Sequence, residues 1–360
     1  MNRSASMGTL LLLAVLCCHE VSASPFDLTW EEVAPGVWTG IRADSTRTPV
    51  LGNTTLVVSA EGVVVFDGGG VPLQSDQVVA KVRELGNQAV THIVVSHWHG
   101  DHDYGIFRIL DAFPHAQVVS HPYTRAKLDK NSVDDTFLTD YIPKIRERVT
   151  ARTYSTGLPM SDADVLRYQD ILDNAALIDQ QQKESKLSYP NITFEDKLTI
   201  WSGHREIRLL HLGRSNTAGD VIMYLPREKI IATGDIDVGP TPYGFGSYPG
   251  EWAQSLRKLK LLDHVLLVPG HGDAQRDDTY LDLLIETMDL VTRQMDNLVA
   301  GGLDLEAARA KMDFSAVQDR FTHGDAFLNR LFDIWFTTPI TEAAWKVASG
   351  KDPELELEAE

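Results

Sequence analysis

Residues 97–102 read HWHGDH and bring three histidines and one aspartate together within six positions. Residues 91–96 are mostly apolar or β-branched, which predicts a buried strand that ends where this segment begins. Because alternate residues at a strand end point to the same side, His97 and His99 can reach one cation together. Asp101 and His102 follow in a turn and can reach a second cation beside the first. The chain therefore has to fold so that further metal ligands converge on the end of this strand.

The donor atoms indicate which metal this segment prefers. Both cysteines of the chain, Cys17 and Cys18, lie in an N-terminal segment that we expect to be removed, so nitrogen and oxygen must supply the ligands. Neutral imidazole with carboxylate suits Zn²⁺ best, with Mn²⁺ or Fe²⁺ as alternatives.

The N-terminus has the pattern of a secretory signal. Arg3 precedes an apolar run over residues 10–16, and Val21-Ser22-Ala23 supplies small residues for cleavage, so residues 1–23 are predicted to be a signal peptide. The apolar run is shorter than the roughly 20 residues that cross a bilayer. We therefore expect a periplasmic or secreted protein with no stable membrane insertion after cleavage. A lipoprotein attached through one of the two cysteines is the alternative.

The charge of the chain excludes one class of partner. The formal net charge is −18, with 51 acidic against 33 basic residues. A nucleic-acid backbone is bound by clustered Lys and Arg, so nucleic acid is not expected as a partner and a small-molecule substrate is. The oligomeric state is not indicated.

The first half of the chain alternates strands and helices. Periodicity predicts strands over residues 55–59, 63–66, 91–96 and 117–120, and helices over residues 75–85, capped by Ser75, and 105–113. Residues from about 122 to 190 contain no convincing strand and are rich in helix-forming residues, which predicts a helical insertion. The insertion could cover the scaffold or act as a lid over the substrate.

After the insertion a sheet resumes. Strands are predicted over residues 192–201, 206–212, 220–225, 229–233 and 265–269, with a helix over residues 251–262. Residues 276–350 read as a helical C-terminal extension and residues 351–360 as an acidic tail, expected to be disordered from Glu354 onward.

The pattern HxHxDH resembles the hallmark of the metallo-β-lactamase superfamily, and the resemblance covers roughly residues 37–272. It implies an α/β fold, an αββα metallo-β-lactamase sandwich over residues 26–275, with the helical insertion and the helical C-terminal extension added to it. The metals of that family lie on loops at one edge of the two sheets.

The resemblance also implies later ligands. Asp235 follows the predicted strand 229–233 and corresponds to the acid that bridges the two metals. His271 closes the strand 265–269 and is expected on the second metal with Asp101 and His102. Asp67 corresponds to a supporting acid that orients a ligand imidazole.

One position departs from the family pattern. Where the family reads GHTxGD, this chain has Asn216 in place of the third histidine of the first site. Three alternatives follow: Asn216 is a weak ligand, a water fills the position, or His211 from the preceding strand substitutes. We favour the water or the weak amide contact, and expect the first site to bind its metal less tightly than the second.

The predicted activity is hydrolysis by a metal-bound hydroxide on two zinc ions, with Asp101 and Asp235 as catalytic residues. An ester, lactone, amide or β-lactam is the expected substrate. The alternatives are a thioester, as for glyoxalase II, or a metal-poor binding protein on the same scaffold. Tyr243, Phe245 and Tyr248 could form a substrate wall or a packed loop, and Trp98 is expected to pack rather than to contact substrate.

Overall fold

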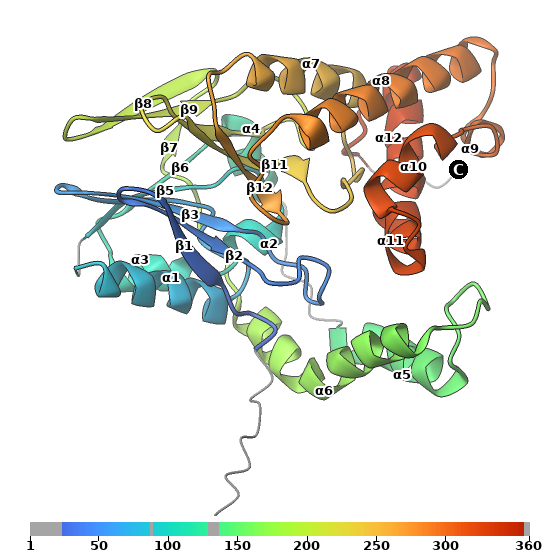
Figure 1. Ribbon diagram of the computed structural model, residues 1–360, viewed down its shortest axis with the longest axis horizontal. Coiled ribbons are helices and arrows are strands. Elements are labelled where there is room, and N and C mark those ends of the chain that lie inside the picture. The colour runs from blue at the N-terminus through green and yellow to red at the C-terminus, as the bar shows by residue number, and fades with distance from the viewer. Residues whose placement is uncertain (1–23, 87–88, 129–136, 356–360) are drawn as a thin grey trace, which may run out of the picture.

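The computed structural model describes residues 24–86, 89–128 and 137–355, so the predicted signal peptide lies outside the described residues. Two β-sheets pack face to face, and helices cover the outer face of each sheet (Figure 1). This is the αββα arrangement expected from the sequence, which is confirmed.

The first sheet contains seven strands in sequential order. They are β1 (Thr29–Ala34), β2 (Val37–Ile41), β3 (Thr54–Ser59), β4 (Gly62–Phe66), β5 (Val90–Val94), β6 (Gln117–Ser120) and β7 (Ile192–Thr193). β1 to β4 pair antiparallel, and β4 to β7 pair parallel. Short helices α2 (Gly100–Asp103) and α3 (Phe107–Ala112) follow β5, and α1 (Pro72–Glu84) precedes it.

The second sheet has five strands in the order β12, β11, β10, β9, β8. They are β8 (Lys197–Ser202), β9 (Arg205–Leu210), β10 (Ile222–Leu225), β11 (Ile230–Val238) and β12 (Leu266–His271). β11 and β12 pair parallel, connected by α7 (Pro249–Lys260), and the other pairs are antiparallel.

Strand alternation divides the apolar residues between the layers. Val64 and Phe66 of β4 face the second sheet, where they pack with residues such as Leu209 and Met223. Val63 and Val65 of the same strand belong to the core beneath α1 and α3. The period of two therefore buries both faces of the first sheet.

The insertion is helical in the part of it that the structure describes. It contains α4 (Pro122–Leu128), η1 (Phe137–Tyr141), α5 (Ile142–Ala151) and α6 (Asp162–Glu184), together with an isolated bridge between Thr153 and Pro159. Ile171 and Ile178 of α6 pack with Phe26 and Val71, so the helices rest against the N-terminal part of the sandwich.

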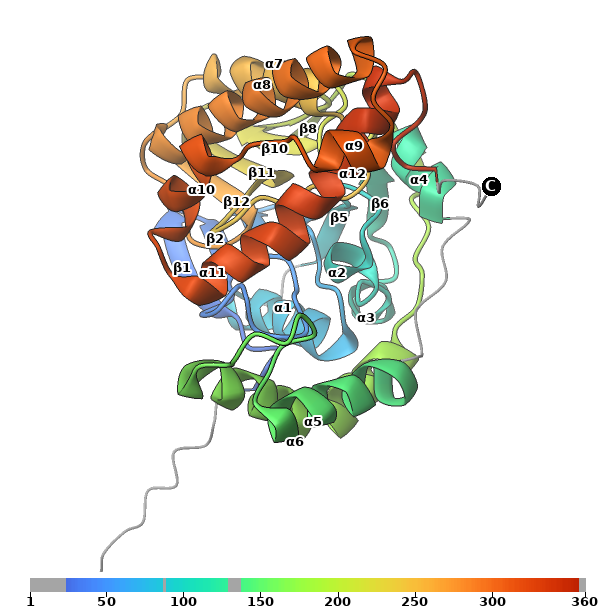
Figure 2. The same cartoon turned by 90° about the vertical axis from the view of Figure 1, so that its right-hand side faces the viewer.

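The C-terminal extension covers the outer face of the second sheet (Figure 2). It contains α8 (Thr279–Ala300), α9 (Leu305–Arg309), α10 (Ser315–Thr322), α11 (Ala326–Leu331), η2 (Phe332–Thr337) and α12 (Thr338–Ala348). Leu284 and Met288 of α8 share one buried cluster with Ile231 of β11 and Trp252 of α7. Within the described residues, every helix is too short or too polar to cross a membrane.

Three sequence expectations are wrong in detail. Residues 192–201 form two strands, β7 and β8, which belong to different sheets. The first helix begins at Pro72, and the Ser75 hydroxyl donates to the Gly68 carbonyl instead of capping the helix. The acidic tail is not disordered at its start, because the Glu354 side chain is 1% exposed and makes hydrogen bonds.

Candidate metal centre

The candidate ligands gather where the parallel strands of both sheets end. Asp67 directly follows β4, residues 97–102 follow β5 within a few positions, Asp235 lies in β11, and His271 is the last residue of β12. β4 and β5 pair parallel, as do β11 and β12, so their carboxyl ends meet at one edge.

Four side chains bring donor atoms close enough together to share one cation. The Nε2 atoms of His102 and His271 lie 3.2 Å apart. Asp101 Oδ2 lies 3.5 and 3.0 Å from these two nitrogens, and Asp235 Oδ1 lies 3.2 and 3.5 Å from them. Zinc bonds of about 2.0–2.1 Å at tetrahedral angles place neighbouring ligand atoms about 3.3 Å apart. The donor set therefore fits a zinc ion.

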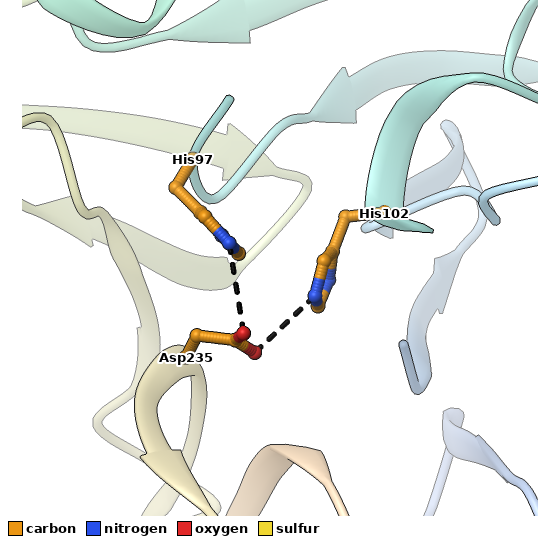
Figure 3. Close-up of side chains that lie close together, drawn as sticks. All are labelled: His97, His102 and Asp235. Atoms are coloured by element: carbon orange, nitrogen blue, oxygen red, sulfur yellow. Dashed lines mark ion pairs between the residues drawn. The ribbon is translucent and has the colours of Figure 1, made fainter. Parts of the chain in front are cut away.

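A second group lies on the other side of Asp235. The Asp235 Oδ2 atom is 3.6 Å from His97 Nε2, while the Asp235 Oδ1 atom faces His102 (Figure 3). His97 Nδ1 contacts the Ser96 hydroxyl at 2.9 Å, which leaves Nε2 directed at the carboxylate. His99 Nδ1 lies 2.9 Å from the same Nε2 atom. One carboxylate thus connects two groups of imidazoles.

Asn216 presents a buried acceptor without a protein partner. Its Nδ2 donates to the Tyr243 carbonyl at 3.2 Å, which fixes the orientation of the amide. Its Oδ1 is buried and makes no hydrogen bond within the described residues. Leaving such an acceptor unsatisfied costs about 1–3 kcal/mol. A cation or a water is therefore needed at Oδ1.

His211 is held outside this cluster. Its Nδ1 lies 2.8 Å from the Asp220 carbonyl oxygen, and its ring packs on His121 with centroids 4.4 Å apart. His211, one of the alternatives for the third ligand of the first site, is thus engaged by Asp220 and His121.

Asp67 supports two parts of the site at once. Its Oδ2 lies 3.0 Å from His102 Nδ1, and its Oδ1 accepts from the Ser96 backbone N–H at 2.8 Å. Asp67 has a φ of 55°, in the left-handed region that Asp tolerates better than most residues. This strained backbone aims the carboxylate at His102, whose Nε2 is then free to face the other ligands.

Burial and charge prepare the donors for a cation. Burial lowers the pKa of His97 and of His99, so both imidazoles stay neutral. Burial alone would lower the pKa of His102, but the surrounding carboxylates outweigh it and raise that pKa well above its usual value. Burial would also raise the pKa of Asp101 and Asp235, yet neighbouring imidazoles hold both pKa values below the usual range. The carboxylates are therefore ionised, as metal ligands must be.

Two glycines that the sequence did not single out make room for the ligands. A Cβ atom on Gly270 would lie 2.0 Å from Asp235 Oδ1, and one on Gly52 would lie 2.4 Å from the His102 ring. The pattern Pro-Gly-His before the last ligand could have drawn attention to Gly270. No local signal exists for Gly52.

The aromatic residues differ in their surroundings. Tyr243 is buried with its ring centroid 5.1 Å from that of His271, and Phe245 is 46% exposed. Tyr248 is buried, and its hydroxyl donates to Asp352. Trp98 is half-buried, and its indole N–H donates to Glu354.

Comparison with known proteins agrees with this arrangement. A linear primary-alkylsulfatase of Pseudomonas sp. (strain ATCC 19151) is 25% identical over 225 residues, which is 60% of this chain and 40% of that enzyme. Among solved structures, a stereoselective inverting sec-alkylsulfatase from Pseudomonas sp. matches with a TM-score of 0.60 at 16% identity, over 89% of this chain and 50% of that one. A metallo-beta-lactamase from Pontibacter korlensis matches with a TM-score of 0.52 at 17% identity, over 73% of this chain and 99% of that one.

The chain thus spans well under half of the curated alkylsulfatase that it matches, whereas it contains nearly the whole metallo-beta-lactamase fold. A sequence profile covers residues 47–271, from the loop after β2 to the last candidate ligand, His271. This profile describes the metallo-beta-lactamase superfamily, and the chain belongs to that superfamily of hydrolases.

Proposed function

We propose that this chain is a zinc-dependent hydrolase that cleaves an ester, lactone, amide or β-lactam bond of a small molecule. The observation that carries the proposal is the set of Asp101, His102, Asp235 and His271. One oxygen of each carboxylate lies 3.0–3.5 Å from the Nε2 atoms of both histidines, and these two nitrogens lie 3.2 Å apart. His97, His99 and the amide oxygen of Asn216 are assigned to the first zinc ion, with a water as the alternative to the amide.

Two zinc ions bound here would lower the pKa of a water and polarise the bond to be cleaved. The residues of the chain have separate tasks. Asp235 directs one carboxylate oxygen toward His97 and the other toward His102, so it connects the ligands of the two sites. Asp101, which is 27% exposed beside buried imidazoles, is the carboxylate positioned to orient the attacking water. Tyr243 forms the wall next to His271.

A sulfate ester is the second candidate substrate. The similarity to the sec-alkylsulfatase extends over 89% of the chain, beyond residues 47–271 and into the helices outside the sandwich. One of these helices, η2, reaches the aromatic residue beside His271, because the rings of Trp335 and Tyr243 have centroids 5.3 Å apart. This similarity therefore supports testing alkyl sulfates beside carboxylic esters and thioesters.

The test is a panel of β-lactam, lactone, ester, thioester, phosphodiester and alkyl sulfate substrates. His102→Ala and Asp235→Ala should lower hydrolysis of the accepted substrate at least about 100-fold, because each removes a donor from the second site. The exposed residues His204 and Asp296 provide matched controls, His204→Ala and Asp296→Ala, which should retain activity. Unchanged activity in both site variants would refute the mechanism. Absence of hydrolysis and less than half an equivalent of zinc per chain would favour a binding protein.

Secretion is part of the same proposal, on the evidence of residues 1–23 alone. Expression of the full chain in a bacterium, followed by fractionation and N-terminal sequencing, should recover a mature protein that begins near Ser24 outside the cytoplasm. A cytoplasmic protein that retains Met1 would contradict it.

A further inference from the structure

The C-terminal end of the described chain folds back onto the loops of the metal centre. Glu354 Oε2 accepts from the indole N–H of Trp98 at 2.9 Å, and Oε1 accepts from the backbone N–H of Ala218 at 2.7 Å. Lys127 Nζ lies 3.4 Å from Oε2. In Figure 2 this last segment runs beside α4, the helix that carries Lys127.

The two loops that Glu354 joins carry candidate ligands of the first site. Trp98 stands between His97 and His99, and Ala218 follows Asn216 by two residues. The loop of Asn216 lies between β9 and β10 and contains no strand or helix of its own. A single carboxylate therefore contacts both of the loops that carry His97, His99 and Asn216.

The tail has anchors that do not depend on Glu354. The Tyr248 hydroxyl donates to Asp352 Oδ1 at 2.9 Å, and Lys346 Nζ donates to the Leu355 carbonyl at 2.7 Å. Pro353, between these anchors, is buried. The backbone of the tail is therefore seated on the molecule whether or not the Glu354 side chain is present.

Burying the Glu354 carboxylate costs desolvation free energy unless hydrogen bonds to its neighbours offset that cost. Its side chain is 1% exposed, and burial raises the pKa of Glu354. An apolar side chain would avoid that desolvation, whereas a carboxylate satisfies a backbone N–H, an indole N–H and an ammonium at once. A glutamate at this position is therefore better explained by its hydrogen bonds to two separate loops than by packing alone.

We propose that Glu354 is a positioning residue of the first metal site, which holds the loops of Trp98 and Ala218 so that His97, His99 and Asn216 converge on one cation. The inference rests on the proposed function, because it requires that the centre binds metal. It predicts that a residue in the acidic tail controls the affinity of one of the two sites.

The test is calorimetric titration of the metal-free full-length protein with Zn²⁺ alone. Glu354→Gln replaces one of the two acceptor oxygens with an NH2 group, so in either orientation of the amide a donor faces the Trp98 N–H or the Ala218 N–H. We expect the weaker binding event to weaken about 10- to 100-fold and the tighter event to stay unchanged. The control is Asp352→Asn, which keeps an acceptor for Tyr248 and touches neither metal loop. Its two events should match those of the parent, and its metal-free thermal midpoint should match that of Glu354→Gln.

Two results would overturn the inference while leaving the proposed function intact. One is a parent with two binding events that Glu354→Gln leaves unchanged. The other is an equal loss in both events with a lowered thermal midpoint, which a purely structural tail would give. A parent that binds no Zn²⁺ would overturn the proposed function and this inference together. Should Glu354→Gln fail to fold, Trp98→Phe removes one of the same hydrogen bonds and must weaken the same event.

Discussion

The Asp67 carboxylate determines which nitrogen of His102 carries a proton. Because it faces Nδ1 at 3.0 Å, the proton on Nδ1 is the one that is retained, and Nε2 is the nitrogen that would give its lone pair to a metal. The ligand types could be predicted from the sequence, since HxHxDH, Asp235 and His271 each follow a predicted strand. The Oδ1 atom of Asn216 could not, because its lack of a donor depends on the fold around it.

Asp67→Asn tests this control of the tautomer. The Asp67 carboxylate offers an acceptor both to His102 Nδ1 and to the Ser96 N–H. The asparagine amide, in either orientation, replaces one of these acceptors with an NH2 donor. Zinc affinity of the tighter site should fall about 10- to 100-fold, measured by competition with a chelating dye. Asp296→Asn, on the exposed face of α8, should bind zinc like the parent. Equal affinities in all three proteins would show that Asp67 has no such role.

Gly270→Ala tests the close approach of the last two ligand strands. The new Cβ would lie 2.0 Å from Asp235 Oδ1 and 2.7 Å from the Gly234 backbone, so β11 or the carboxylate has to move. Hydrolysis should drop at least about tenfold, since a displacement of about 1 Å at a catalytic site can cost that much or more. In Gly250→Ala, the nearest atom is the end of the Thr292 side chain at 3.3 Å, so its activity should be retained. Parent-like rates in Gly270→Ala would refute the packing argument.

At the scale of elements, most strands and helices could be predicted from periodicity, and the errors have physical reasons. β11 continues through Asp235 to Val238, with register shifts against β12 and a φ of 53° at Gly234. Such irregularities re-aim a side chain within a strand, and they resemble a turn in the sequence. Residues 192–201, predicted as one strand, are divided between two sheets. Alternation cannot reveal this division, because Ile192 of β7 and Ile200 of β8 both pack in the core between the sheets.

His121, between β6 and α4, is expected to make the stability of the fold depend on pH. Burial and the neighbouring His211 lower the pKa of His121 to about 4, so the folded chain binds that proton less readily than the unfolded chain does. Stability from this group is present above about pH 6.5 and is lost as the pH falls toward about 4. His121→Asn keeps an acceptor for the Tyr123 N–H, and should lose less stability between about pH 7 and about pH 5.

Urea unfolding at both pH values measures the difference. His204→Asn, in the exposed β8–β9 turn, is the control and should show the same pH dependence as the parent. A His121→Asn protein whose unfolding midpoint falls as steeply as that of the parent would contradict the assignment.

At the scale of the whole molecule, the C-terminal helices share a buried core with the outer face of the second sheet. The cluster that contains Ile231 and Trp252 also contains Leu284, Phe332 and Ile340, all buried. A chain cut after residue 276 would expose this face, and each such side chain contributes about 1.5–3 kcal/mol when buried. We expect the truncated protein to be insoluble or to lack a cooperative thermal transition, while removal of residues 356–360 alone should leave the transition unchanged. A soluble, cooperatively folding truncated chain would show that the helices are a separate unit.

Long-range contacts are the part of the molecule that the sequence conceals most. Trp98 and Glu354 are 256 residues apart, and nothing near either residue marks them as partners. Local patterns predicted the acidic composition of the tail, yet the carboxylate of Glu354 is buried against the loops of the metal centre. The layers, the site edge and most ligands follow from local patterns, whereas the connections between distant loops follow only from the fold.

The asymmetry of the metal centre is the central claim, and titration of the metal-free protein with Zn²⁺ tests it most directly. The parent should show two binding events of unequal affinity. Asn216→His should tighten the weaker event at least about tenfold, because imidazole is a better zinc ligand than an amide oxygen, and should leave the tighter event unchanged. Two equal events that Asn216→His does not alter, or less than half an equivalent of bound zinc, would contradict it.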